Sequence, residues 1–307
     1  MQFPRLARQA IAMAALALSA GGAHAVPLVG LTTLNGLARF DTANVAVSTT
    51  VAITGLAAGD RFVGIDLRPS NNLIYGITLS NQIYTVNEFT GAATFVAALS
   101  SPIINSEFRY GIDFNPVADF GGAASLRLVS DRGGNFAINV ADGTVGNAAN
   151  TIENGFTGVA YTNSMAGGGA PASTALYYIN SLGSTLSVAT SAFNAPTITT
   201  VGALGIFLCR PPSADGCGFT SPVGFEIASN GVAYGAFNFF DNNNSLNARI
   251  YTVNLATGAA TSIGMFNGTL SGLTVSAVPQ PGTYALMVAG LAGLGFVARR
   301  RRVGTDR

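Results

Sequence analysis

The sequence has no lysine and no tryptophan, and its single histidine is His24. Charged residues make up only 9% of its 307 residues. Without lysine, the chain has neither a Schiff-base amine nor the lysine of a P-loop. A Ser-His-Asp triad or a zinc site with histidine ligands would need His24, which lies in an N-terminal segment that we expect to be removed, so both are equally excluded. Most familiar classes of enzyme therefore do not fit this composition, and no metal or cofactor is expected.

The first 25 residues have the three parts of a secretory signal peptide. A basic start with Arg5 and Arg8 leads into an apolar run over 10–20, which ends at the small-residue site Ala23-His24-Ala25. The alternative is an N-terminal anchor helix, but the run is too short to span a membrane. We therefore expect signal peptidase to cut between Ala25 and Val26, which removes the histidine and exports the chain.

The segment 26–277 holds eight arginines and thirteen acidic residues, a net charge of about −5. Such a domain is a poor partner for nucleic acid. Its two cysteines, Cys209 and Cys217, flank a stretch with Pro-Pro and Asp-Gly, which is typical of a turn. In an oxidising compartment this spacing favours a small disulfide loop, while free thiols or a redox role are the alternatives.

A short phrase of glycine, an apolar residue and often an acid recurs along the domain. Its copies begin at Gly64, Gly111, Gly158, Gly224 and Gly272, at intervals of 47, 47, 66 and 48 residues. The longest interval contains the two cysteines and reads as an ordinary unit with an insertion. Residues 83–87 and 250–254 are also identical, and each is followed by the turn sequence Thr-Gly-Ala-Ala-Thr.

Four short strands in a unit of about 47 residues match one blade of a β-propeller, whose sheet needs neighbours to cover its faces. The sequence predicts an all-β fold of five four-stranded blades, with units starting near 28, 62, 109, 156 and 223. The first unit lacks an inner strand, which residues 272–276 can supply, so that the two ends of the chain close the ring. A β-sandwich or another β-repeat array is the alternative.

A separate tail, 278–307, follows the domain. It holds Pro279-Gln280-Pro281, an apolar stretch over 284–298 and the basic residues Arg299, Arg300, Arg301 and Arg302. A helix of that stretch reaches roughly 22 Å, short of a hydrocarbon core of about 30 Å, so we expect transient rather than permanent membrane insertion. The arginines would keep the end of the tail in the cytoplasm.

This tail resembles the PEP-CTERM sorting signal of Gram-negative bacteria, in which a Pro-Glu-Pro motif, a short apolar helix and an arginine cluster are read by exosortases. Gln280 stands where the motif usually has glutamate. The resemblance implies processing by an exosortase-type enzyme and delivery to the cell surface or the extracellular matrix.

The body of the chain resembles the bacterial domain of unknown function 4394. The resemblance covers most of 28–277 and is carried by 30–33, 37–41, 63–69, 111–116 and 127–131. It implies no established activity and no catalytic residues.

Three acids occupy the third position of the repeated phrase: Asp66, Asp113 and Glu226. On inner strands they would converge on the centre of the ring, where paired carboxylates can hydrolyse glycosides as general acid and base. The alternative, which we favour, is that each acid bonds backbone amides near a strand end. Recurrent tyrosines, among them Tyr75 and Tyr234, can stack on sugars but suit packing between blades better.

The sequence therefore predicts an exported, sorted surface or matrix protein, most simply a non-enzymatic binding or structural module associated with exopolysaccharide. A carbohydrate-active hydrolase that uses the three inner-strand acids is the alternative.

Overall fold

A computed structural model describes residues 25–147, 151–208, 223–240 and 246–277, and these form five antiparallel sheets of four strands each. The first sheet has the order β20 (Leu270–Val275), β1 (Pro27–Thr32), β2 (Gly36–Asp41) and β3 (Asn44–Ala52). The second has β4 (Phe62–Arg68), β5 (Leu73–Thr78), β6 (Gln82–Val86) and β7 (Ala93–Ala98).

The other three sheets follow in chain order. The third consists of β8 (Tyr110–Phe114), β9 (Leu126–Ser130), β10 (Asn135–Ile138) and β11 (Val145–Gly146), with the short helix α2 (Pro116–Phe120) between β8 and β9. The fourth consists of β12 (Phe156–Tyr161), β13 (Leu176–Asn180), β14 (Thr185–Ala189) and β15 (Ile198–Ala203). The fifth consists of β16 (Val223–Ile227), β17 (Ala233–Phe240), β18 (Leu246–Val253) and β19 (Ala260–Phe266).

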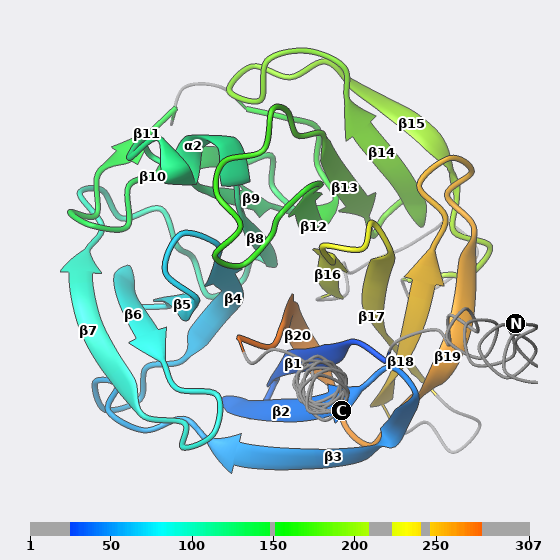
Figure 1. Ribbon diagram of the computed structural model, residues 1–307, viewed down its shortest axis with the longest axis horizontal. Helices are drawn as coiled ribbons and strands as arrows, with labels where there is room; N and C mark the ends of the chain where they lie inside the picture. Colours follow the sequence, from blue (N-terminus) through cyan, green and yellow to red (C-terminus); the bar gives the residue numbers. More distant parts are fainter. Residues whose placement is uncertain (1–24, 148–150, 209–222, 241–245, 278–307) are drawn as a thin grey trace, which may run out of the picture.

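The five sheets stand around a common centre as the blades of a propeller (Figure 1). Their innermost strands, β20, β4, β8, β12 and β16, contact one another in that cyclic order. The predicted fold, a five-bladed β-propeller, is thereby confirmed.

The ring closes within the first blade, where the last described strand pairs with the first. β20 runs antiparallel to β1, with Leu28 opposite Val275 and Gly30 opposite Leu273. The inner strand that the first unit lacks is thus supplied from the C-terminal end of the domain, as the repeats predicted. This closure gives β1 a partner on its inner side, so the first blade has four strands like the other blades.

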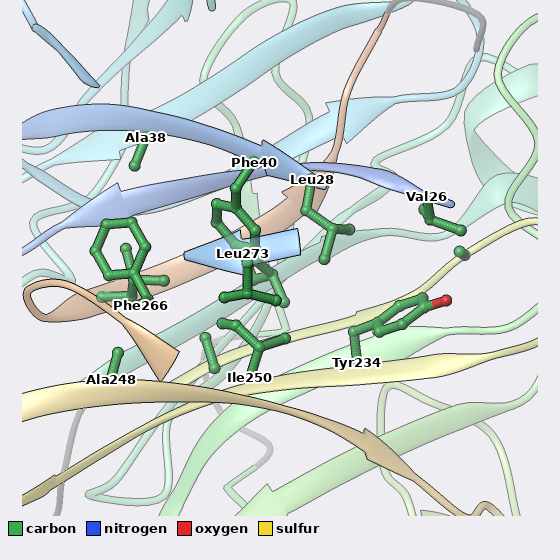
Figure 2. Packing of buried hydrophobic residues seen from close by; sticks show 13 residues of the cluster. Val26, Leu28, Ala38, Phe40, Tyr234, Ala248, Ile250, Phe266 and Leu273 are labelled. Atoms are coloured by element: carbon green, nitrogen blue, oxygen red, sulfur yellow. The ribbon is translucent and has the colours of Figure 1, made fainter. Parts of the chain in front are cut away.

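The apolar core of the protein is divided among the interfaces between neighbouring blades. Five clusters of buried side chains each draw on two adjacent sheets. Figure 2 shows the cluster at the closing interface, where Leu28 and Phe40 of the first blade face Tyr234 and Ile250 of the fifth. A single blade therefore has no core of its own, and the ring must form for any blade to bury both faces.

The inner strands approach one another very closely at the repeated glycines. A Cβ atom added at Gly111 would lie 2.9 Å from the Cα atom of Gly158, and one added at Gly224 would lie 2.5 Å from the Cβ of Leu273. Real Cβ atoms are not found so close to backbone, so these positions admit only glycine. What remains at the centre is a void of about 10 Å³ lined by residues of all five inner strands.

Several sequence predictions fall outside the described residues: the cysteine pair, the Pro279-Gln280-Pro281 motif, the apolar stretch 284–298 and the arginines 299–302. Within the described part of the chain, no helix is long and apolar enough to cross a membrane.

Candidate functional site

The three inner-strand acids meet near the centre of the ring. Asp66 lies in β4, Asp113 in β8 and Glu226 in β16. One carboxylate oxygen of each lies within 4.8 Å of the others. Each residue is only 3–4% exposed. The structure therefore brings together the three carboxyl groups that the repeat singled out, but it closes them off from solvent.

Two of these carboxylates hold the backbone of the next blade. The amide of Phe114 in β8 donates to Asp66 Oδ2 at 2.7 Å, and the amide of Tyr161 in β12 donates to Asp113 Oδ1 at 2.9 Å. In both pairs the donor follows the acceptor by 48 residues. The repeated acid thus provides a hydrogen-bond acceptor for a buried amide of the neighbouring inner strand. Without an acceptor, that buried amide would lower the stability of the fold.

Thr274 of β20 extends the same pattern to the closing blade. The amide of Leu67 in β4 donates to Thr274 Oγ1 at 3.0 Å, and the Thr274 hydroxyl donates to Asp66 Oδ1 at 2.9 Å. A threonine therefore takes the role of an acid in the last repeat. We call these bonds from an inner-strand side chain to the amide of the next inner strand the inter-blade clasps.

One inner strand departs from the pattern. The fourth blade has Ala160 at the clasp position, and alanine offers no acceptor to the amide of Ile227. The carboxyl group of Glu226, one methylene longer than that of aspartate, lies against the amides of both Ile227 and Val275. Both amides favour the charged form of this carboxyl group and so lower its pKa.

Burial controls the ionisation of this cluster. Desolvation raises the pKa of Glu226 to about 7, although hydrogen bonding by Thr274 and backbone amides opposes the rise. Desolvation also raises the pKa of Asp66 well above its usual value, and the charge of Glu226 adds to the rise. The pKa of Asp113 is raised in the same way, first by desolvation and then by Asp66 and Glu226. Carboxyl groups so close cannot all be charged, and the cluster retains protons near neutral pH.

This geometry does not suit hydrolysis of a glycoside. The adjoining central void is about the size of one water probe and is lined by the repeated glycines, not by the acids. Calcium fits no better, because it takes six to eight oxygen ligands and both oxygens of Asp66 already accept hydrogen bonds from the protein. The three carboxyl groups can therefore join neighbouring blades and retain protons.

Arg127 is a buried charge that the sequence analysis did not identify. It lies in β9 opposite Asp113 and is 4% exposed. Its Nη1 and Nη2 donate to the side-chain oxygens of Asn135 at 3.0 Å and Asn194 at 2.8 Å, and its Nε donates to the Tyr161 hydroxyl at 3.3 Å. The sequence feature that could have identified it is an arginine inside an otherwise apolar strand. Its contacts tie the third blade to the fourth.

The recurrent tyrosines lie between blades. Tyr75, Tyr84, Tyr234 and Tyr251 are each at most 9% exposed and belong to the inter-blade clusters. They pack rather than present their rings to a ligand, which was the interpretation the sequence favoured.

Comparison with known proteins identifies two matching families. The family Domain of unknown function (DUF4394) matches residues 36–274, and the PEP-CTERM protein-sorting motif matches residues 277–302. No curated protein matches the chain.

Solved structures with a similar fold are remote in sequence. A putative 6-phosphogluconolactonase from Bacteroides fragilis is 10% identical, with a TM-score of 0.41 over 82% of this chain and 98% of that one. A protein of unknown function from Bacteroides thetaiotaomicron is 12% identical, with a TM-score of 0.44 over 82% of this chain and 64% of that one. A putative 6-phosphogluconolactonase from Bacteroides uniformis is 9% identical, with a TM-score of 0.39 over 80% and 84%. Likeness at this level says nothing about activity.

The inter-blade clasp of Asp113 can be tested with two substitutions. Asp113→Ala leaves the Tyr161 amide without its acceptor, and we expect a loss of about 1–3 kcal/mol in the free energy of unfolding. Asp113→Asn keeps an oxygen at the same place and should stay close to the wild type. Urea unfolding of the two purified variants measures both effects, and equal losses would show that the charge rather than the acceptor matters.

The raised pKa of Glu226 predicts the direction of a pH dependence. A glutamate ordinarily titrates near 4.5, so its contribution is fully present below that pH and is lost as the pH rises through about 7. We expect the free energy of unfolding to fall by something on the order of 2 kcal/mol between pH 5 and pH 8. Glu226→Gln should reduce this slope in urea unfolding but not abolish it, because burial also raises the pKa values of Asp66 and Asp113. A slope in the variant as steep as that of the wild type would contradict the assignment.

Proposed function

We propose a function for this chain from the premise that it belongs to the family Domain of unknown function (DUF4394) and carries a PEP-CTERM protein-sorting motif. The motif indicates an exosortase-sorted extracellular protein. Within that class we propose a non-enzymatic module of the cell surface or matrix of a Gram-negative bacterium, which binds or organises exopolysaccharide.

The observation that carries the non-enzymatic half of this proposal is the use of the three central acids. Asp66 and Asp113 accept amides of the neighbouring blades, and Glu226 lies against two more. All three are shielded from solvent. Acids that hold the ring together, and that line neither the central void nor the two larger cavities among the described residues, do not favour a hydrolase.

The contacts at both ends of the domain support cleavage of the two terminal segments at points outside the propeller. Val26, the predicted first residue after signal cleavage, packs into the closing core and donates its amide to Thr42 Oγ1 at 2.8 Å. At the other end, buried Glu88 accepts the Ser276 hydroxyl at 2.7 Å and the Ala277 amide at 3.0 Å. The sorting motif begins two residues later, so removal of either end would leave the propeller intact.

We further propose that the apolar stretch 284–298 inserts into the membrane only until exosortase acts, with the arginines 299–302 on the cytoplasmic side. The calculated reach of such a helix, short of a full span, supports a temporary anchor.

The experiment for this proposal mixes the protein, purified from the surface fraction of its host, with the host's own exopolysaccharide. We expect the protein to co-sediment with the polymer without shortening it, as measured by size-exclusion chromatography with light scattering. Shortened chains that disappear with Asp113→Asn would instead establish the hydrolase alternative. Failure to co-sediment would overturn the association with polysaccharide.

A further inference from the structure

A cavity of about 350 Å³ opens where the inner strands β4 and β8 begin, well away from the acids further along the same strands. Its walls come from the turn between β1 and β2, the starts of β4, β8 and β20, and the turn between β5 and β6. Binding sites for small molecules commonly have this size, with apolar walls and a few polar groups.

Two arginines line this cavity, and the structure makes them equivalent. The Arg61 carbonyl accepts the amide of Leu79, and the Arg109 carbonyl accepts the amide of Asp131, both at 3.0 Å. The carbonyl groups of Gly155 in the fourth blade and Thr269 in the first accept the equivalent backbone amides. The fold therefore tolerates residues without charge at this position. Arg109 Nη1 donates to the carbonyl groups of Phe108 at 3.2 Å and Glu107 at 3.4 Å, which orient the guanidinium group without neutralising its charge.

Neither guanidinium group is neutralised within the described residues, where the ion pairs are Arg39 with Glu88 and Arg68 with Asp119. Two nearby carboxylates accept the backbone amides of these same arginines. Asp60 Oδ1 accepts the amide of Arg61 at 2.9 Å, and Asp131 Oδ1 accepts the amide of Arg109 at 3.1 Å.

The lining of the cavity contains no acidic residue. It thus carries two positive charges in a domain that is acidic as a whole.

The remaining wall combines aromatic and hydroxyl groups held in place by the fold. Phe62 and Tyr110 are buried, and the Tyr110 hydroxyl accepts the amide of Asn105 at 2.7 Å. Asn35 has a positive φ of 59° and accepts the Phe62 amide at 3.2 Å. The hydroxyl group of Thr33, which lines the cavity, contacts that of Thr269. Phe108, which is partly exposed and also lines the cavity, adds an apolar ring face beside these hydrogen-bonding groups, as the two sides of a sugar ring require.

We propose that this cavity binds a carboxylated sugar unit of an acidic polysaccharide, with Arg61 and Arg109 pairing with the carboxylate. Guanidinium groups form paired, charge-assisted hydrogen bonds with carboxylates, and these are stronger than bonds between neutral groups. The inference rests on the proposed function and deepens it, because it locates the polysaccharide contact and gives the polymer a charge.

Calorimetry on the protein purified from its host tests this assignment with three probes: a tetramer of galacturonic acid, the neutral tetramer maltotetraose and inorganic phosphate. We expect the acidic tetramer to bind and the neutral one to bind at least about tenfold more weakly, since charge-assisted bonds carry the affinity. Arg61→Gln and Arg109→Gln should each weaken the acidic tetramer about tenfold or more. Arg249→Gln removes the same charge from β18, outside the cavity, and should leave binding unchanged.

Three results would overturn the proposal: equal affinity for the two tetramers, binding of phosphate but of neither tetramer, or loss of binding in Arg249→Gln that matches the loss in the cavity variants. Absence of any binding would also overturn it. If the protein nevertheless co-sedimented with the host exopolysaccharide, the proposed function would stand and only the cavity assignment would fall.

Discussion

The ring depends on one interaction, the hydrogen bond from a backbone amide of one inner strand to a side chain of the inner strand before it. Asp66, Asp113 and Thr274 each accept such an amide. These bonds cross between blades at the narrowest part of the ring, where backbone groups are shut off from water and must find protein partners. Burying three carboxyl groups for this purpose is costly, and proton retention by the cluster lowers that cost.

The glycine of the repeated phrase and its acid are two parts of one device. Glycine lets neighbouring inner strands come within a distance at which any side chain would clash, as at Gly111 against Gly158. Two residues further on, the acid reaches across that short gap to the next strand. Because the gap is short, the same feature that joins the blades also closes the centre of the ring. A ligand is therefore better accommodated at the mouth, beside Arg61 and Arg109, than among the acids.

Much of this fold could be predicted from the sequence, because each repeat records one blade. The spacing of the glycines predicted five blades. The last copy of the repeated phrase, at Gly272, is not followed by further strands of its own and so predicted how the ring closes. The meeting of Asp66, Asp113 and Glu226 also followed from their shared position. The partners of these acids did not, because a repeat shows where a side chain lies but not which amide it accepts. The equivalence of Arg61 and Arg109 in the two blades was not visible in the repeats. A bulge at Val63 makes the two arginines 48 residues apart, whereas the glycines of the repeated phrase are 47 apart.

Residue-by-residue hydrogen exchange of the native protein tests the inter-blade clasps most directly. If the inner-strand side chains hold the ring, the amides of Leu67, Phe114 and Tyr161 should exchange only through global unfolding, as slowly as the most protected amides of the sheets. Exchange of these three amides at the rate of exposed loop amides would contradict the account, because it would mean that the carboxyl groups are free for another role.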